Sequence, residues 1–114
     1  MFLEAILSSL KGGVAVLDRE LRVRIWNSKS ADLWGLGADE ALDRNFLSLD
    51  IGLPVEDLGR SLRDSLGGNS QDSVVVLDAT NRRGRAIRCR VTITPLNGPN
   101  GDTHGVILHM EEAA

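Results

Sequence analysis

The sequence contains few of the residues on which redox, metal and membrane chemistry depend. It has one cysteine, Cys89, in 114 residues, which excludes an intrachain disulfide and a cysteine-rich metal site. Its apolar runs are all shorter than the roughly 18 residues that a membrane span needs. Near the amino terminus, Glu4 stands where a signal peptide would carry positive charge. We therefore expect a cytoplasmic protein that spans no membrane.

Histidine and aromatic residues are also scarce. The two histidines, His104 and His109, both fall in the last predicted strand, where a spacing of five places them on opposite faces and prevents them from sharing a metal ion. The net charge is −3, and the one dense group of arginines lies in residues 47–114, which contain no aromatic residue on which bases could stack. We expect no metal site and no nucleic-acid partner.

The usual arrangements of catalytic residues are missing as well. We find no supported nucleophile–base pair and no glycine loop that would cradle a phosphate after a strand. Cys89 alternates with Ile87 and Val91, which predicts a small buried hydrophobe rather than a redox sensor. The domain itself is therefore not expected to be an enzyme.

The spacing of apolar residues divides the chain into helical and extended segments. Apolar residues recur at three- and four-residue intervals over residues 2–10, which predicts an amphipathic helix that ends at Gly12 and Gly13. Alternation then predicts a hairpin of two short strands. The strands are expected at 14–18, 21–27, 72–79, 85–96 and 103–111, with three short helices between 28 and 68.

This order predicts a compact α+β domain built on one five-stranded antiparallel sheet. We expect two parts, the amphipathic helix at residues 1–12 and the domain at residues 13–114. One open alternative concerns the outer sheet face, where arginines of matching parity could provide a basic surface for an acidic partner helix. These arginines are Arg22, Arg24, Arg88 and Arg90.

Several short markers follow one another in a recognisable order. They are VAVLDRELRVRIWN at 14–27, Ala31 with LWG at 33–35, NRRGR at 81–85 and TPL at 94–96. Together with the element order, they resemble the PAS family of sensory and interaction domains from about Gly13 to Met110. More narrowly, LWGLGADEALDRNFLSLDIGLP and NRRGRAIRCRVT are similar to the PAS module fused to bacterial chemotaxis receptor methyltransferases. Asp43 departs from the family pattern, in which glycine is usual.

The resemblance implies a PAS-like sheet with the helical insert on its inner face and the amino-terminal helix on its outer face. It makes Asn27 a structural residue that bonds backbone groups left unpaired where strand becomes helix. Alternation would then point Val23 and Ile25 under the helices and Trp26 to the outer face. The predicted interface consists of Phe2, Leu3, Ile6, Leu7, Leu10 and Trp26.

The resemblance also implies a regulatory or sensory module of a bacterial, chemotaxis-like signalling protein. Such a module would act through protein–protein interaction and as a homodimer. Catalytic activity would belong to a separate attached domain, such as a protein methyltransferase. The family often ends its last strand in Asp-Ile-Thr, and this chain reads MEEAA instead. We therefore expect an upstream effector, joined through residues 1–12.

The alternative function is the sensing of a small ligand held noncovalently in an apolar cavity. Heme-binding members of the family usually supply a histidine from the helical insert, and residues 28–68 contain none. Flavin photosensors have a cysteine where this chain has Phe46, so no cofactor is predicted. The cavity would be lined by Val16, Ile25, Leu33, Trp34, Phe46, Leu62, Ile87, Cys89 and Val91.

Overall fold

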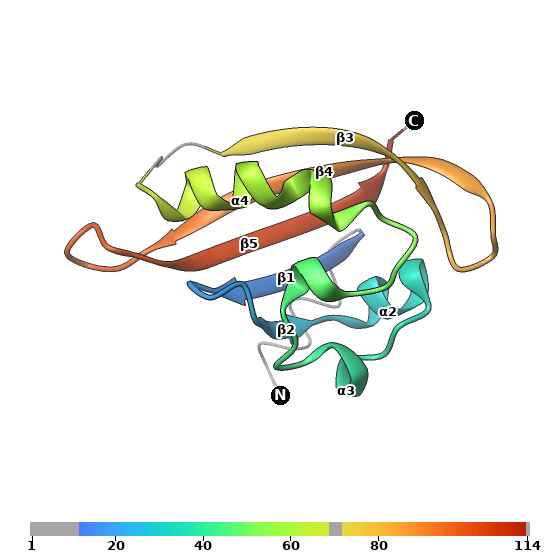
Figure 1. Ribbon diagram of the computed structural model, residues 1–114, viewed down its shortest axis with the longest axis horizontal. Helices are drawn as coiled ribbons and strands as arrows, with labels where there is room; N and C mark the ends of the chain where they lie inside the picture. Colours follow the sequence, from blue (N-terminus) through green and yellow to red (C-terminus); the bar gives the residue numbers. More distant parts are fainter. Residues whose placement is uncertain (1–11, 69–71, 114) are drawn as a thin grey trace.

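One antiparallel sheet forms the base of the computed structural model, which describes residues 12–68 and 72–113. Its strand order is β2-β1-β5-β4-β3, so the first and last strands of the chain lie side by side (Figure 1). The predicted α+β class and five-stranded sheet are confirmed. The strands are β1 (Gly13–Asp18), β2 (Val23–Trp26), β3 (Ser73–Thr80), β4 (Ala86–Asn97) and β5 (Thr103–Glu112).

The chain between β2 and β3 forms the helical insert, which covers one face of the sheet. In this insert α2 packs on β1, α3 on β2, and α4 on β4 and β5 (Figure 1). Among the described residues, none of the helices reaches the length and apolarity that crossing a membrane requires. Of the helix predicted at residues 1–12, residues 1–11 lie outside the described part of the chain. The insert comprises α2 (Ser28–Trp34), α3 (Ala38–Ala41), the 3₁₀ turns η1 (Phe46–Ser48) and η2 (Val55–Leu58), and α4 (Gly59–Leu66).

The face of the sheet beneath the insert is the hydrophobic core. In β4, Cys89, Val91 and Ile93 are buried, whereas Arg88 and Arg90, which alternate with them, are exposed, as the alternation of the sequence predicts. The insert closes the core from above with large, fully buried side chains. These include Phe46, Leu58 and Leu62.

A bulge in the β1–β2 pair reverses part of the sequence prediction. Ile25 pairs with Val16 and Val23 pairs with the next residue of β1, so Arg24 is an extra residue in β2. Because the extra residue shifts the alternation, Val23 and Trp26 both belong to the core, while Ile25 lies on the outer face beside Val16. The predictions that Ile25 points under the helices and that Trp26 points outward are wrong.

The free side of β2 is covered by the segment between α3 and η1. The amide of Asp43 donates to the carbonyl of Val23 at 2.9 Å, and the amide of Val23 donates to the carbonyl of Arg44 at 2.9 Å. The amide of Phe46 donates to the carbonyl of Leu21 at 2.8 Å. This edge of the sheet is therefore closed to pairing with another strand.

Candidate functional site

Buried polar contacts hold the corner where β2 passes into α2. Oδ1 of the buried Asn27 accepts hydrogen bonds from the backbone amides of Val14 and Ser30, both at 2.9 Å. The Ser30 hydroxyl donates to the Val14 carbonyl at 3.1 Å. Asn27 therefore caps α2, as an asparagine at a strand-to-helix corner can, and also joins that helix to β1.

Sequence reasoning missed two other residues of this corner, Ser30 and Gly13. Ser30 is fully buried, and a Cβ at Gly13 would lie only 2.6 Å from the Ser30 hydroxyl oxygen. The close approach of β1 to α2 therefore requires glycine at position 13. No local pattern identifies Ser30, because its acceptor on Val14 lies 16 residues away in the chain.

Trp26 is a core residue and not the interface residue that the sequence predicts. Only 4% of its surface is exposed, and its indole Nε1 donates a hydrogen bond to the carbonyl of Leu36 at 2.7 Å. The indole thus fastens the loop after α2 to the sheet. Both tryptophans of the chain, Trp26 and Trp34, belong to the same buried cluster.

Several residues predicted to line a cavity are packed against one another instead. Phe46, Leu62, Cys89 and Val91 each have an exposed fraction of 0%, so no space large enough for a water molecule adjoins them. A ligand could reach these side chains only by displacing their neighbours. The core beneath the insert is therefore filled at these positions.

The remaining predicted lining residues fall into two groups. Trp34 and Ile87 are buried, and Leu33 is partly buried against the same cluster. Val16 and Ile25 lie on the outer face of the sheet, so the prediction that they line an inner cavity is wrong. The cause is again the bulge, because it moves Ile25 away from the helices.

Two buried polar atoms have no hydrogen-bond partner among the residues that the structure describes. They are Nε1 of Trp34 and Oγ of Ser65. A buried polar group without a partner loses its hydration on folding and gains no bond in return. Because Ser65 is fully buried, its hydroxyl has no space for a water molecule beside it, so the missing bond is a cost to the stability of the core.

Ser65→Ala is expected to leave the free energy of unfolding unchanged or to raise it by up to about 1 kcal/mol, because it removes an unbonded buried hydroxyl. Ser30→Ala is the matched control. Ser30 is equally buried, but its hydroxyl donates to Val14, so a loss of about 1–2 kcal/mol is expected. Urea unfolding measures both changes. A larger loss for Ser65→Ala than for Ser30→Ala would reveal a partner for the Ser65 hydroxyl.

The thiol of Cys89 is unreactive. Burial raises the pKa of Cys89 to about 11, which keeps the sulfur protonated at neutral pH. Since the thiolate is the reactive form, the side chain serves as a small hydrophobe in the core, as its alternation with apolar neighbours predicts.

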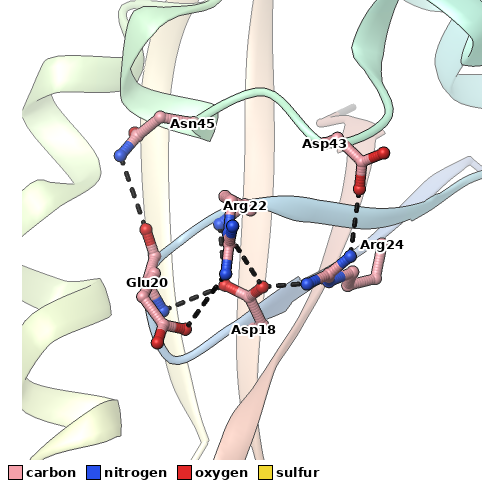
Figure 2. A network of polar contacts seen from close by, with 6 residues as sticks. All are labelled: Asp18, Glu20, Arg22, Arg24, Asp43 and Asn45. Atoms are coloured by element: carbon pink, nitrogen blue, oxygen red, sulfur yellow. Dashed lines mark hydrogen bonds and ion pairs between the residues drawn. The ribbon is translucent and has the colours of Figure 1, made fainter.

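A polar network joins the β1–β2 turn to the segment that covers β2 (Figure 2). The carboxylate of Asp18 accepts from the amides of Glu20 and Arg22 at 2.9 and 3.0 Å, and from Nε of Arg24 at 2.9 Å. Burial alone would raise the pKa of Asp18, but these hydrogen bonds and the Arg22 charge lower it below its ordinary value. The network therefore stabilises the fold above the ordinary aspartate pKa of 3.8 and loses this contribution as the pH falls through the lowered pKa.

Asp43 ends this network and has a positive φ of 68°, which glycine adopts more easily. Asp43→Gly is expected to change the free energy of unfolding by less than about 1 kcal/mol, because relief of backbone strain offsets loss of the exposed ion pair with Arg24. Asp43→Ala keeps the strain and loses the pair, so a loss of about 1 kcal/mol is expected. Urea unfolding ranks the two variants, and the reverse ranking would contradict the left-handed backbone.

The outer face of the sheet has an apolar centre. Val16 and Ile107 face each other across β1 and β5, and Ile25 lies beside Val16 on β2, all partly exposed. Farther along the sheet, Val74 and Val76 of β3 are 60% and 39% exposed. The described helices lie on the opposite face (Figure 1). This apolar centre, Val16, Ile25 and Ile107, is called the outer apolar patch below.

The arginines expected to make the outer face basic have acidic neighbours. Arg88 lies 3.7 Å from Asp78, and Arg90 lies 3.6 Å from Glu111. The two arginines near the β1–β2 turn both contact Asp18 in the network of Figure 2. The basic character that would attract an acidic helix is therefore largely neutralised.

Hollows at the surface offer shallow sites with charged rims. One, of about 510 Å³, lies between residues 49–54 and the end of β3, and Glu56 and Asp78 form part of its wall. Another, of about 470 Å³, adjoins Lys29 and Asp32. In the described part of the chain, no three His, Cys, Asp or Glu residues are grouped to hold a metal ion. Neither hollow has the enclosed apolar walls typical of small-molecule sites.

Comparison with known proteins gives one consistent match. The family described as PAS fold matches residues 7–114. VqmA of Vibrio cholerae, solved with a ligand and DNA, is 16% identical with a TM-score of 0.81, over 97% of this chain and 50% of VqmA. The PAS domain of Bordetella pertussis BvgS is 19% identical with a TM-score of 0.81, over 99% and 85% of the two chains. A PAS domain from Colwellia psychrerythraea is 14% identical with a TM-score of 0.78, over 98% and 94%.

These structural similarities show a shared fold, since all three identities are low. The chain spans about half the length of VqmA, which is much longer than this sequence.

Proposed function

Because the chain belongs to the PAS family, which its residues 7–114 match, we propose that it is the regulatory module of a bacterial signalling protein and acts through homodimerisation and protein–protein contacts. PAS domains are generally sensory, non-catalytic modules. Within the chain, we assign residues 1–12 to an amphipathic segment and residues 13–114 to the domain itself.

The observation that supports this proposal is the difference between the two faces of the sheet. On the inner face, Phe46, Leu62 and Cys89 are fully enclosed by neighbouring side chains. On the outer face, the outer apolar patch lies away from all the described helices (Figure 1). We infer that this partly exposed apolar surface is a protein–protein contact.

The amphipathic segment is the proposed cover of the outer apolar patch, either in its own subunit or across a dimer. Its apolar stripe consists of Phe2, Leu3, Ile6, Leu7 and Leu10. In such a dimer, a small rotation of one sheet against the other would pass through residues 1–12 to an attached effector. The resemblance to modules fused to chemotaxis receptor methyltransferases suggests an enzyme of that class as the effector.

Light scattering of the full chain and of two charge variants tests the dimer. Ile107→Glu places a charge in the outer apolar patch, and Leu42→Glu places the same charge at an exposed leucine outside that patch. The full chain and Leu42→Glu are expected to have the same mass, whereas Ile107→Glu and a chain without residues 1–11 should have a lower mass while remaining folded by circular dichroism. Dimers of unchanged mass in all four proteins would overturn the proposal.

A second candidate function is noncovalent ligand sensing, in which a ligand that displaces core side chains would bond the unpartnered Trp34 Nε1 or Ser65 Oγ. The test compares native with denaturing mass on freshly purified protein, together with its absorption spectrum. A mass lost on denaturation, or absorbance at wavelengths longer than those of tryptophan, would establish the ligand. Equal masses and a colourless protein would favour the filled core and the interaction module.

A further inference from the structure

The two edges of the sheet are protected to different degrees. Residues 43–46 pair with the edge of β2, whereas β3, at the other end of the strand order, has β4 as its neighbour. In the described part of the chain, one further backbone bond reaches β3: the amide of Thr80 donates to the carbonyl of Gly52 at 2.8 Å. The stretch before Thr80 is an open edge.

The Thr80 bond reveals which backbone groups of β3 point away from β4. Because the amide of Thr80 is directed outward, and because backbone groups alternate along a strand, the N–H and C=O groups of Val74, Val76 and Asp78 are directed outward too. None of these groups bonds to another described backbone group. The edge thus presents a row of hydrogen-bonding groups that an extended strand can satisfy.

The side chains on this row are unusual for a free edge. Val74 and Val76 are 60% and 39% exposed, and residues 73–77 carry no charge and no proline. The pairing of β3 with β4 is continuous from Ser73 to Thr80, without a bulge. Edge strands of monomers are normally blunted by charges, proline or bulges. Residues 73–77 have none of these protections.

We propose that β3 pairs in antiparallel fashion with β3 of a second copy of this chain, about a twofold axis at Val76. In this register Val76 lies opposite Val76 of the partner subunit, and Val74 lies opposite Asp78 of the partner subunit. Each opposed pair exchanges both of its backbone hydrogen bonds. The exposed valines of the two strands then form one apolar cluster on the outer face, and no two like charges oppose each other.

Neighbouring twofold registers are disfavoured by charge or by existing bonds. An axis at Val75 places Asp72 opposite Asp78 of the partner subunit, and an axis at Asp78 opposes two aspartates directly. An axis at Leu77 requires the amide of Thr80, which is already bonded. The register at Val76 avoids both difficulties.

This pairing goes beyond the proposed function and uses a different surface. The outer apolar patch lies on β1, β2 and β5, whereas the pairing uses the edge of β3. Ile107→Glu should therefore leave the β3 pairing intact. Failure of one contact can be recognised independently of the other.

Disulfide cross-linking under mild oxidation tests the register. Paired residues at the twofold axis have Cα atoms about 5.5 Å apart, within disulfide range, so Val76→Cys is expected to form a covalent dimer. Val74→Cys is the matched control. Val74 is more exposed than Val76, but each Val74 lies opposite Asp78 of the partner subunit, so the two cysteines at position 74 would be too far apart to bond. Cys89 does not compete, because it is buried. Val76→Cys should cross-link roughly tenfold faster or more, because pairing raises the local thiol concentration.

A second variant separates pairing from chance collision. Val76→Pro removes an N–H group that β4 does not use, so the fold should remain intact. Ile107→Glu alone is expected to rise in mass with concentration in sedimentation experiments. This rise should disappear when Ile107→Glu and Val76→Pro are combined. Equal cross-linking of Val76→Cys and Val74→Cys, or a rise in mass that Val76→Pro leaves unchanged, overturns the pairing. The open edge would then be available to an extended segment of another protein.

Discussion

Trp26→Ala is expected to lower the free energy of unfolding by about 3–5 kcal/mol, the range for removing a buried aromatic side chain. Trp26 is 4% exposed, lies in the core cluster, and bonds the carbonyl of Leu36 through its indole. The substitution leaves a cavity and also leaves that carbonyl without its donor. Urea unfolding followed by circular dichroism gives the change directly.

The neighbouring residue provides the control for this prediction. Ile25→Ala removes an apolar side chain from the outer face, where burial is partial, so a loss of about 1 kcal/mol or less is expected. Suppose that Trp26→Ala lowered the free energy of unfolding no more than Ile25→Ala and instead dissociated a dimer. This result would contradict the bulge at Arg24. Trp26 would then be the interface residue that simple alternation predicts.

Asn27→Ala is expected to lower the free energy of unfolding by about 3 kcal/mol, because two buried amides lose their acceptor at once. These amides belong to Val14 and Ser30, so the loss affects both the start of α2 and its contact with β1. Urea unfolding again measures the effect. Asn27→Asp keeps an acceptor oxygen and should recover part of the loss.

Asn45→Ala is the matched control for Asn27→Ala. Asn45 also caps a helical turn, with its Oδ1 accepting from the amide of Leu47 at 2.8 Å, but this asparagine is exposed. Water can replace the lost bond, so a cost of about 0.5–1 kcal/mol is expected. A loss at Asn27 no greater than that at Asn45 would contradict the double role of the buried corner.

These two positions also bear on the proposed function. A regulatory module that transmits a rotation needs a sheet that moves as one body. Trp26 joins the loop after α2 to β2, and Asn27 joins α2 to β1, so both keep the helical insert fixed to the sheet. In the proposed mechanism, substitutions at either position should therefore weaken coupling to the attached effector.

Much of the architecture can be predicted from the sequence because it depends on local periodicity. The long period-two run around Cys89 specifies a strand with one apolar face, and the glycine at position 35 specifies where α2 ends. The markers that resemble the PAS family add that the helical insert covers one face of the sheet, which no single strand reveals. Fold class and the inner face of β4 were accordingly predicted correctly.

The candidate site was predicted less well because it depends on contacts between distant segments. One extra residue, Arg24, shifts the alternation of β2, and no sequence pattern announces that bulge. As a result Trp26 and Ile25 exchange faces relative to the prediction. The pairing of arginines with Asp18, Asp78 and Glu111 likewise follows from the register of neighbouring strands.

The sequence by itself determined which segments become strands and helices and which face of the longest strands is apolar, because these features arise from neighbours a few residues apart. Only the tertiary structure decided which edge of the sheet is closed, since residues 43–46 reach β2 through the helical insert and leave β3 open. It also decided that Trp26, like Trp34, faces the core. A side chain's orientation depends on register, and register is set by partners that the local sequence does not contain.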